Sequence, residues 1–498
     1  MPIFLDTQVV SNAFKDIPTF FHSGASICSV VASAIEAMLQ SKTLLLIARR
    51  ITHSRGDSSS KTRNKLMTDE TRHFAVNPFY PTSLRGIFRQ LLALGAMALC
   101  LGCGSITMAQ TAAPGFVQDR FAIGLWVEPP ASDADGATYY KDIAEANLSL
   151  VIAISTPDIP KQLELCKLNG LKAIVNATGS PDTFPEDEAC WGYLMIDEPN
   201  AKVFPALAKN MQAIYKARPG RLGYINLFPN YATPEQLGAR NYDDYVAKFV
   251  RDVKPQVLSM DHYPSMRPEQ DTRESYCENL ETMRKHSLLA GIPFWNFFYS
   301  MPFNDRIDPT EAQIRWQIYT SVAYGAKGVL YFCYWTPGKG AAGKGEFPKG
   351  GALITAEGRK TRHWDEARRI NGELKHLGPT LMSLTSTGVY RVNTGKRTAK
   401  TLAGSPVKSI TKVHGDPEGE FIVGAFKGKD GKRAVLILNH NYSYTAWPTV
   451  EFEADPTQVM EVDKATGQLN PVIDDSPELE GLQLSLGAGD GRLFVLPN

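Results

Sequence analysis

The sequence predicts a (β/α)8 barrel, an α/β fold of the TIM type, followed by a small antiparallel β-sandwich. From residue 121 onward, short apolar runs alternate with amphipathic segments, which is typical of consecutive β–α units. After Gly378 the helical periodicity disappears and the turns become rich in Gly and Asp. A chain of 498 residues also exceeds what one hydrophobic core normally serves, so we expect two globular units.

The barrel is expected over residues 115–380, about the 250 residues usual for this fold. Its eight strands are predicted at 121–127, 148–154, 171–176, 191–196, 221–227, 256–261, 293–299 and 328–334. Helical stretches are predicted at 160–168, 204–217, 242–252, 274–289, 309–324 and 363–376. An open doubly wound sheet is the alternative, but no Gly-rich phosphate loop follows the first strand.

The sandwich is expected over residues 384–498. Its strands are predicted at 420–426, 433–439, 448–453, 458–463 and 492–496, separated by short Gly- and Asp-containing turns.

Upstream of the barrel, residues 85–109 are typical of a secretory signal. A basic flank precedes an apolar stretch of about a dozen residues and a small-residue region ending near Ala109. We therefore expect export to the periplasm or the exterior, with an outer-membrane lipoprotein formed through Cys103 as a variant. Residues 1–84 are expected to lie outside the fold, either as a disordered extension or because translation starts at Met67.

Composition and charge exclude several classes of function. The net charge of +1 offers no electrostatic basis for binding nucleic acid. No integral membrane domain is expected after removal of the signal. No metal-ligand spacing or P-loop is present, so we expect neither a metal nor a cofactor. The sequence does not determine the oligomeric state.

The most informative motif is an apolar run that ends in Asp197-Glu198-Pro199. Buried unpaired charges are costly, so two carboxylates at the end of a strand indicate a solvent-filled mouth. Pro199 ends the strand because it has no N–H to donate. Carboxylates at the C-terminal end of a barrel strand are typical of sites that transfer protons to a glycosidic oxygen.

The stretches GYLMIDEPN, LGYINLFPNYA, LSMDHYP, PFWNFFYSM and PTEAQIRWQIYTSVAYGAKGVLYFCYWTP, taken in order, resemble the barrel of clan A retaining glycoside hydrolases. The resemblance covers residues 121–380 and implies that Glu198 is the general acid/base. In that clan Asn precedes this Glu and the seventh strand supplies a Glu nucleophile. Here Asp197 precedes it, and residues 293–301 contain no carboxylate.

Two candidates remain for the second catalytic group. The Asp-Glu pair is also similar to glycoside hydrolase families 20 and 123, where the Asp orients a substrate acetamido group that acts as nucleophile. Asp261, at the end of the sixth strand, is the other candidate. It would activate water from roughly 6.5–9.5 Å or act as a nucleophile at roughly 5–5.5 Å from Glu198.

Further polar and aromatic residues at or near strand ends are candidates for binding a sugar. They are Trp126, Glu128, Asn226, His262, Tyr263, Trp295, Asn296, Tyr299 and Trp335. Each also has a structural alternative, either core packing or a hydrogen bond to the backbone. Together these residues predict a glycosidase that acts on an oligo- or polysaccharide. The alternative is a non-catalytic carbohydrate-binding protein on a degenerate barrel, which the missing seventh-strand Glu favours.

Overall fold

The computed structural model describes residues 115–154, 157–337, 351–395 and 401–497. The expected signal over 85–109, Cys103 and residues 1–84 lie outside the described residues. No helix within the described ranges is long and apolar enough to cross a membrane.

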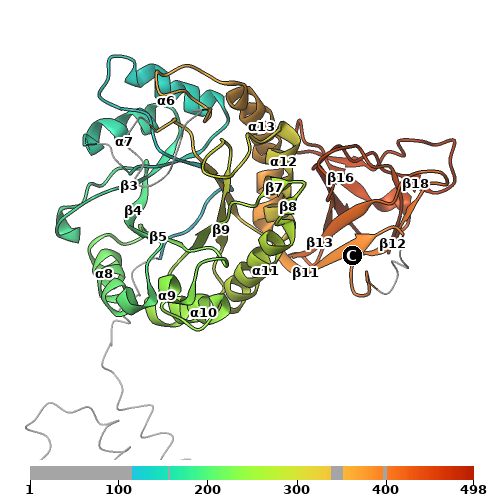
Figure 1. The fold of residues 1–498 in the computed structure, drawn as a ribbon, viewed down its shortest axis with the longest axis horizontal. Helices are drawn as coiled ribbons and strands as arrows, with labels where there is room; N and C mark the ends of the chain where they lie inside the picture. The colour runs from blue at the N-terminus through green and yellow to red at the C-terminus, as the bar shows by residue number, and fades with distance from the viewer. Residues whose placement is uncertain (1–114, 155–156, 338–350, 396–400, 498) are drawn as a thin grey trace, which may run out of the picture. The chain divides into compact units, whose positions relative to one another are not determined.

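Eight parallel strands close into a barrel in the order β1-β10-β9-β6-β5-β4-β3-β2 (Figure 1). Their bounds are β1 Ala122–Trp126, β2 Leu150–Ile152, β3 Lys172–Val175, β4 Cys190–Asp197, β5 Leu222–Leu227, β6 Leu258–Asp261, β9 Phe294–Tyr299 and β10 Gly328–Phe332. All eight coincide with the apolar runs read from the sequence. The predicted (β/α)8 barrel is therefore confirmed.

Helices follow the strands and pack around the barrel (Figure 1). They are α6 Gly136–Glu145, α7 Ile159–Leu168, α8 Phe204–Ala217, α9 Pro234–Leu237, α10 Tyr242–Val253, α11 Arg273–Ala290, α12 Glu311–Ala323 and α13 Arg362–Ser383. Helix α6 was not predicted. It is short, and its large buried side chains are only Tyr140 and Ile143, too few to show a helical period.

The C-terminal region forms two antiparallel sheets, which confirms the predicted β-sandwich. One sheet has the order β11-β13-β14-β19-β16-β17 and the other the order β12-β15-β18. The bounds are β11 Leu384–Asn393, β12 Val407–Lys412, β13 Glu420–Gly428, β14 Arg433–Asn439, β15 Pro448–Phe452, β16 Met460–Val462, β17 Leu469–Pro471, β18 Leu482–Gln483 and β19 Gly491–Leu496. A separate cluster of buried apolar side chains, including Val423, Ile437 and Phe494, fills the space between the sheets.

The remaining elements are short. A two-stranded ribbon, β7 Met266–Arg267 and β8 Gln270–Asp271, follows β6. Three 3-10 turns lie at η1 Pro181–Thr183, η2 Ala201–Val203 and η3 Pro456–Gln458. The four described cysteines (Cys166, Cys190, Cys277 and Cys333) are all buried and free, as expected for small apolar core residues.

Candidate active site

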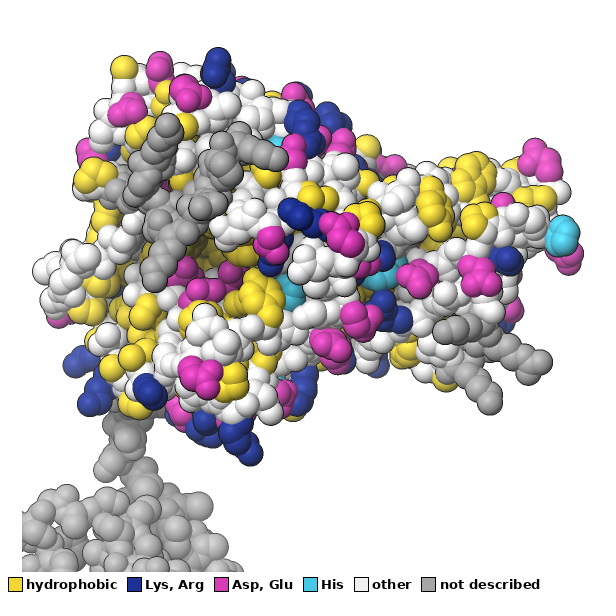
Figure 2. All heavy atoms as spheres, viewed as in Figure 1, with side chains coloured by type: hydrophobic (Ala, Val, Ile, Leu, Met, Phe, Trp, Pro, Cys, Tyr) yellow, Lys and Arg dark blue, Asp and Glu magenta, His cyan; other side chains and the backbone are white. Residues whose placement is uncertain are grey.

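A pocket of about 230 Å³ opens where the barrel strands end. Asp197, Asp261 and Phe332 are the last residues of their strands, and all three line it. Figure 2 shows acidic side chains gathered in a hollow at the centre of the barrel. The full lining is Trp126, Asp197, Glu198, Asn226, Asp261, Tyr263, Phe297 and Phe332. The three carboxylates that the sequence predicted to be catalytic therefore line one pocket.

The backbone of β4 explains how two consecutive carboxylates reach the same pocket. Successive side chains of a regular strand point to opposite faces. The pairing of β4 with β5 shifts between Leu194 and Ile196, which is a bulge or local irregularity of the register. Glu198 then leaves the strand with φ at +46°, in the left-handed region that non-glycine residues rarely adopt. Its N–H still donates to the Asn226 carbonyl oxygen at 2.9 Å. This strained turn directs Glu198 back beside Asp197.

Asn226, on β5, connects two of the carboxylates. Its Nδ2 donates to Oδ1 of Asp197 and to Oδ1 of Asp261, each at 3.1 Å. Ser259 Oγ donates to Asn226 Oδ1 at 3.0 Å, and Ser259 Oγ also bonds the Tyr224 hydroxyl at 2.8 Å. This chain fixes the orientation of the amide, so that its NH2 group faces the acids.

The three acids favour their protonated forms to different degrees. Burial and the neighbouring Asp197 charge raise the pKa of Glu198 to about 7. Burial raises the pKa of Asp197, while hydrogen bonds from Asn226 and from the Glu198 backbone oppose that shift. Burial and the charges of Glu198 and Asp197 raise the pKa of Asp261 well above its usual range. Asp197 is therefore the acid most readily ionised, and Glu198 holds a proton near neutral pH.

No cation in the described part of the chain offsets these carboxylates. No Lys, Arg or His there forms an ion pair with Asp197, Glu198 or Asp261. The described residues also contain no group of three His, Cys, Asp or Glu that could hold a metal ion. The pKa values of the three acids are therefore set by desolvation, by the charges of the acids themselves and by hydrogen bonds such as those from Asn226.

Aromatic side chains form the walls of the pocket. Trp126 and Phe297 meet edge to face with ring centroids 5.5 Å apart, and Tyr263 lies 5.1 Å from Phe332. Phe297 and Phe332 were missed by the sequence analysis. Phe332 ends its strand, which was an available signal. Phe297 shares the inner face of β9 with Trp295, which could have been inferred from the period of two.

The structure corrects three residues assigned to sugar binding on β9. Trp295 lies lower in the barrel interior, fully buried, between Trp191 and Tyr224, and its Nε1 donates to Gln118 at 3.0 Å. Asn296 points out of the barrel, where its amide donates to hydroxyls of Tyr276 and Ser321. It therefore does not reach the pocket as a sugar ligand.

The third residue, Tyr299, is fully buried next to Phe303, outside the pocket lining. Glu128 is also buried, and its Oε2 accepts the Ile154 N–H at 3.0 Å, which is a structural role. Trp335 packs edge to face on Tyr139 with centroids 4.9 Å apart and does not line the pocket. A position at or near the end of a strand therefore does not by itself identify the residues that line the pocket.

His262 takes a supporting position rather than a binding one. Its imidazole is buried, bonds Asn279 Oδ1 at 3.0 Å, and has its pKa lowered by burial to about 4, so it is neutral. The ring of Tyr231 lies 5.0 Å from it, edge to face, and Tyr231 is 51% exposed. Tyr231, which the sequence analysis did not select, thus presents an aromatic surface above His262.

No protein-family model and no curated protein sequence matches this chain. Similar solved structures include a β-galactosidase from Bacillus circulans sp. alkalophilus, at 11% identity and a TM-score of 0.48 over 76% of this chain and 99% of that one. Another is a β-galactosidase from the psychrophilic Marinomonas ef1, at 12% identity and a TM-score of 0.36 over 51% of this chain. A third is a β-glucuronidase from Faecalibacterium prausnitzii, at 11% identity and a TM-score of 0.36 over 49% of this chain.

This chain spans 60% of the Marinomonas enzyme and 46% of the Faecalibacterium enzyme. All three of these solved proteins are glycosidases by name. At these identities and TM-scores the likeness says nothing about activity.

Proposed function

We propose that this chain is a glycoside hydrolase that cleaves an O-glycosidic bond of an oligo- or polysaccharide, with Glu198 as the general acid/base. The observation that carries the proposal is the pairing of Glu198, whose pKa is raised to about 7, with the adjacent Asp197 in a pocket walled by aromatic rings. A general acid must hold its proton at working pH and release it to the leaving oxygen. Aromatic walls suit the apolar faces of a sugar ring.

The size of the pocket supports recognition of a single sugar at the reaction centre. Its 230 Å³ lies below the roughly 300–1,000 Å³ of pockets for drug-sized ligands. Trp126 is the last residue of β1, and Tyr263 lies just after β6. The two aromatic side chains therefore come from segments that are far apart in the sequence. A ring held between such walls would present its glycosidic oxygen to the acids that line the same pocket.

For the second catalytic group, the electrostatics favour Asp197 over Asp261. Asp261 is 7% exposed, and burial together with the charges of Glu198 and Asp197 raises its pKa well above the usual range, which disfavours the ionised form that a base or nucleophile needs. Asp197 lies at the more exposed mouth and accepts two hydrogen bonds that favour its charged form. We therefore place the negative charge on Asp197, where it would orient a substrate acetamido group as the internal nucleophile. Direct participation of Asp261 is the competing mechanism.

A binding-only barrel is the alternative function. Such a barrel would hold Glu198 in an ion pair or turn it away from the pocket. Among the described residues no basic side chain pairs with Glu198, and its carboxylate lines the pocket with two others. A backbone strain at Glu198 is also a feature that accumulates at functional sites.

The test is hydrolysis of a panel of aryl glycosides, including N-acetylhexosaminides, by the wild type, Glu198→Gln and Asp197→Asn. We expect Glu198→Gln to lower kcat by about 10²–10⁴-fold on the responding sugar. Glu357→Gln is the matched control: Glu357 is exposed and does not line the pocket, so its replacement should leave kcat unchanged. A response limited to N-acetyl sugars supports the acetamido mechanism, and a response to simple hexosides supports Asp261. Binding of sugars without hydrolysis of any substrate, polymers included, would overturn the proposal in favour of the binding protein.

We also propose export, which rests on the basic, apolar and small-residue pattern of residues 85–109. N-terminal sequencing of the protein secreted by an expression host checks it. If the protein is exported, its mature N-terminus should lie close to Ala109 or at a lipid-modified Cys103.

A further inference from the structure

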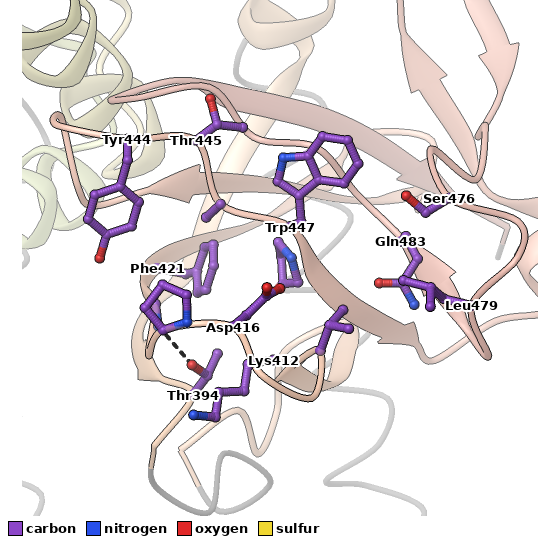
Figure 3. Close-up of a pocket in the computed structure, with 15 residues that line it drawn as sticks. Thr394, Lys412, Asp416, Phe421, Tyr444, Thr445, Trp447, Ser476, Leu479 and Gln483 are labelled. Carbon is purple, nitrogen blue, oxygen red and sulfur yellow. Dashed lines mark hydrogen bonds between the residues drawn. The ribbon is translucent and has the colours of Figure 1, made fainter.

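A second cavity lies wholly within the sandwich, and no residue lines both it and the barrel pocket. Its volume is about 460 Å³, twice that of the barrel pocket. Figure 3 shows that its walls come from the segment before β15, the turn after β12, and the loop before β18. The two cavities are therefore separate sites by their lining.

Two aromatic side chains dominate the cavity. Trp447 is 46% exposed and Tyr444 is 42% exposed, and both project from the short segment that enters β15 at Pro448 (Figure 3). Exposed rings of this size scattered singly need no explanation, but two in one concave site mark a binding surface. Both rings have an apolar face with a polar atom at one end, which suits ligands that are amphipathic in the same way.

The backbone that carries these rings is held in place without any ligand. Ala446, between them, pairs with Leu486 through two N–H···O bonds of 2.9 Å. The amide of Asn439, a fully buried residue, donates to the Tyr444 carbonyl oxygen at 2.9 Å. A preorganised surface loses little conformational entropy when it binds, so the rings are suited to recognition.

Two side chains of opposite charge line the same cavity. Lys412 ends β12, and Asp416 lies in the turn that follows, near Trp447 (Figure 3). Among the described residues neither of them forms an ion pair. One cation and one anion give the lining no net charge, which disfavours nucleic acids and strongly anionic ligands. Both remain able to bond neutral hydroxyl groups.

We propose that this cavity binds a neutral oligosaccharide segment, with Trp447 and Tyr444 stacking on sugar rings and Lys412 and Asp416 bonding their hydroxyls. The choice of a sugar over another neutral amphipathic ligand rests on the proposed function of the barrel. A volume twice that of the barrel pocket gives room for more than one sugar unit. The site would hold a polysaccharide on the enzyme while the barrel acts on another part of the same polysaccharide.

Affinity electrophoresis of the full chain tests the proposal. Native gels contain a soluble β-glucan, a xylan, an arabinan or a galactan, and the Glu198→Gln background prevents consumption of the polymer. We expect at least one polymer to retard the protein, with Trp447→Ala and Tyr444→Ala each weakening the apparent Kd by about tenfold. Trp447→Phe should retain most of the affinity. Leu469→Ala, which removes an equally exposed apolar side chain outside the cavity, is the control and should change nothing.

The outcomes separate this site from the barrel. Retardation that disappears in Trp447→Ala supports the sandwich site even if no glycoside is hydrolysed, in which case only the proposed hydrolase function fails. Retardation that is unchanged in both alanine variants, with their thermal midpoints equal to wild type, overturns the sandwich site and leaves the hydrolase proposal standing. Absence of retardation by every polymer also overturns it. Should Trp447→Ala fail to fold, Tyr444→Ala and Trp447→Phe carry the comparison.

Discussion

Glu198 follows Asp197 directly in the chain, yet both carboxylates line one pocket. The left-handed φ of Glu198, +46°, reverses the alternation that a regular strand would impose. The neighbouring charge of Asp197 then raises the pKa of Glu198, together with burial, to about 7. Local backbone strain thus produces the juxtaposition on which the proposed chemistry depends.

The pH dependence of catalysis follows from this pair. The proposed acid must be protonated, so kcat/KM should fall as the pH rises through about 7. Asp197→Asn removes the neighbouring charge and should move this basic limb to lower pH, in addition to lowering kcat. The measurement is a pH profile of kcat/KM for both proteins on an aryl glycoside. A basic limb that stays in place in Asp197→Asn would show that the two carboxylates are not electrostatically coupled.

Protein stability should show the same titration. The pKa of Glu198 is raised above its ordinary 4.5 in the folded state, so the folded protein holds this proton more tightly than the unfolded chain. The contribution is complete below about pH 4.5 and is lost as the pH rises to about 7. Glu198→Gln should therefore raise the free energy of unfolding at pH 8 by about 1 kcal/mol or more, and change it little at pH 4.5. Denaturant titrations at both pH values provide the test, and an equal effect at both would contradict it.

Asn226 is expected to position the acids rather than to react. Asn226→Ala removes the donor shared by Asp197 and Asp261 and should raise the pKa of Asp197. The acidic limb of the pH profile should then move to higher pH, with a loss of stability of about 1–3 kcal/mol. Asn371→Ala is the matched control, because Asn371 is equally buried and hydrogen-bonded on α13, and does not line the pocket. It should lose comparable stability with an unchanged profile; a shifted profile in the control would point to a general structural effect.

Two tryptophans near the barrel mouth should behave differently. Trp126 lines the pocket, so Trp126→Ala should raise KM by about tenfold through the loss of a stacking surface. Trp335 packs on Tyr139 outside the pocket, so Trp335→Ala should cost about 1–3 kcal/mol of stability without changing KM. Steady-state kinetics and thermal unfolding of both variants make the comparison. The assignment is wrong if KM responds to Trp335→Ala and not to Trp126→Ala.

The architecture was largely predictable from the sequence. All eight barrel strands were located because a parallel barrel strand is a continuous apolar run, and such runs stand out between amphipathic helices. Four strands of the sandwich were missed: β11 and β12, because their exposed faces are polar and their runs are mixed, and β17 and β18, because they are only two or three residues long. Helix α6 was missed because two large buried side chains do not define a period.

The sequence by itself determined the (β/α)8 order and the presence of three carboxylates at strand ends, since strand period and strand termination are local properties. Tertiary structure decided the rest. The fold places Glu198 beside Asp197 through a backbone turn that the sequence pattern does not predict. It also directs Asn296 outward, to Tyr276 and Ser321. Which strand-end side chains reach a common pocket depends on register and on packing between distant strands, and neither is encoded in any one segment.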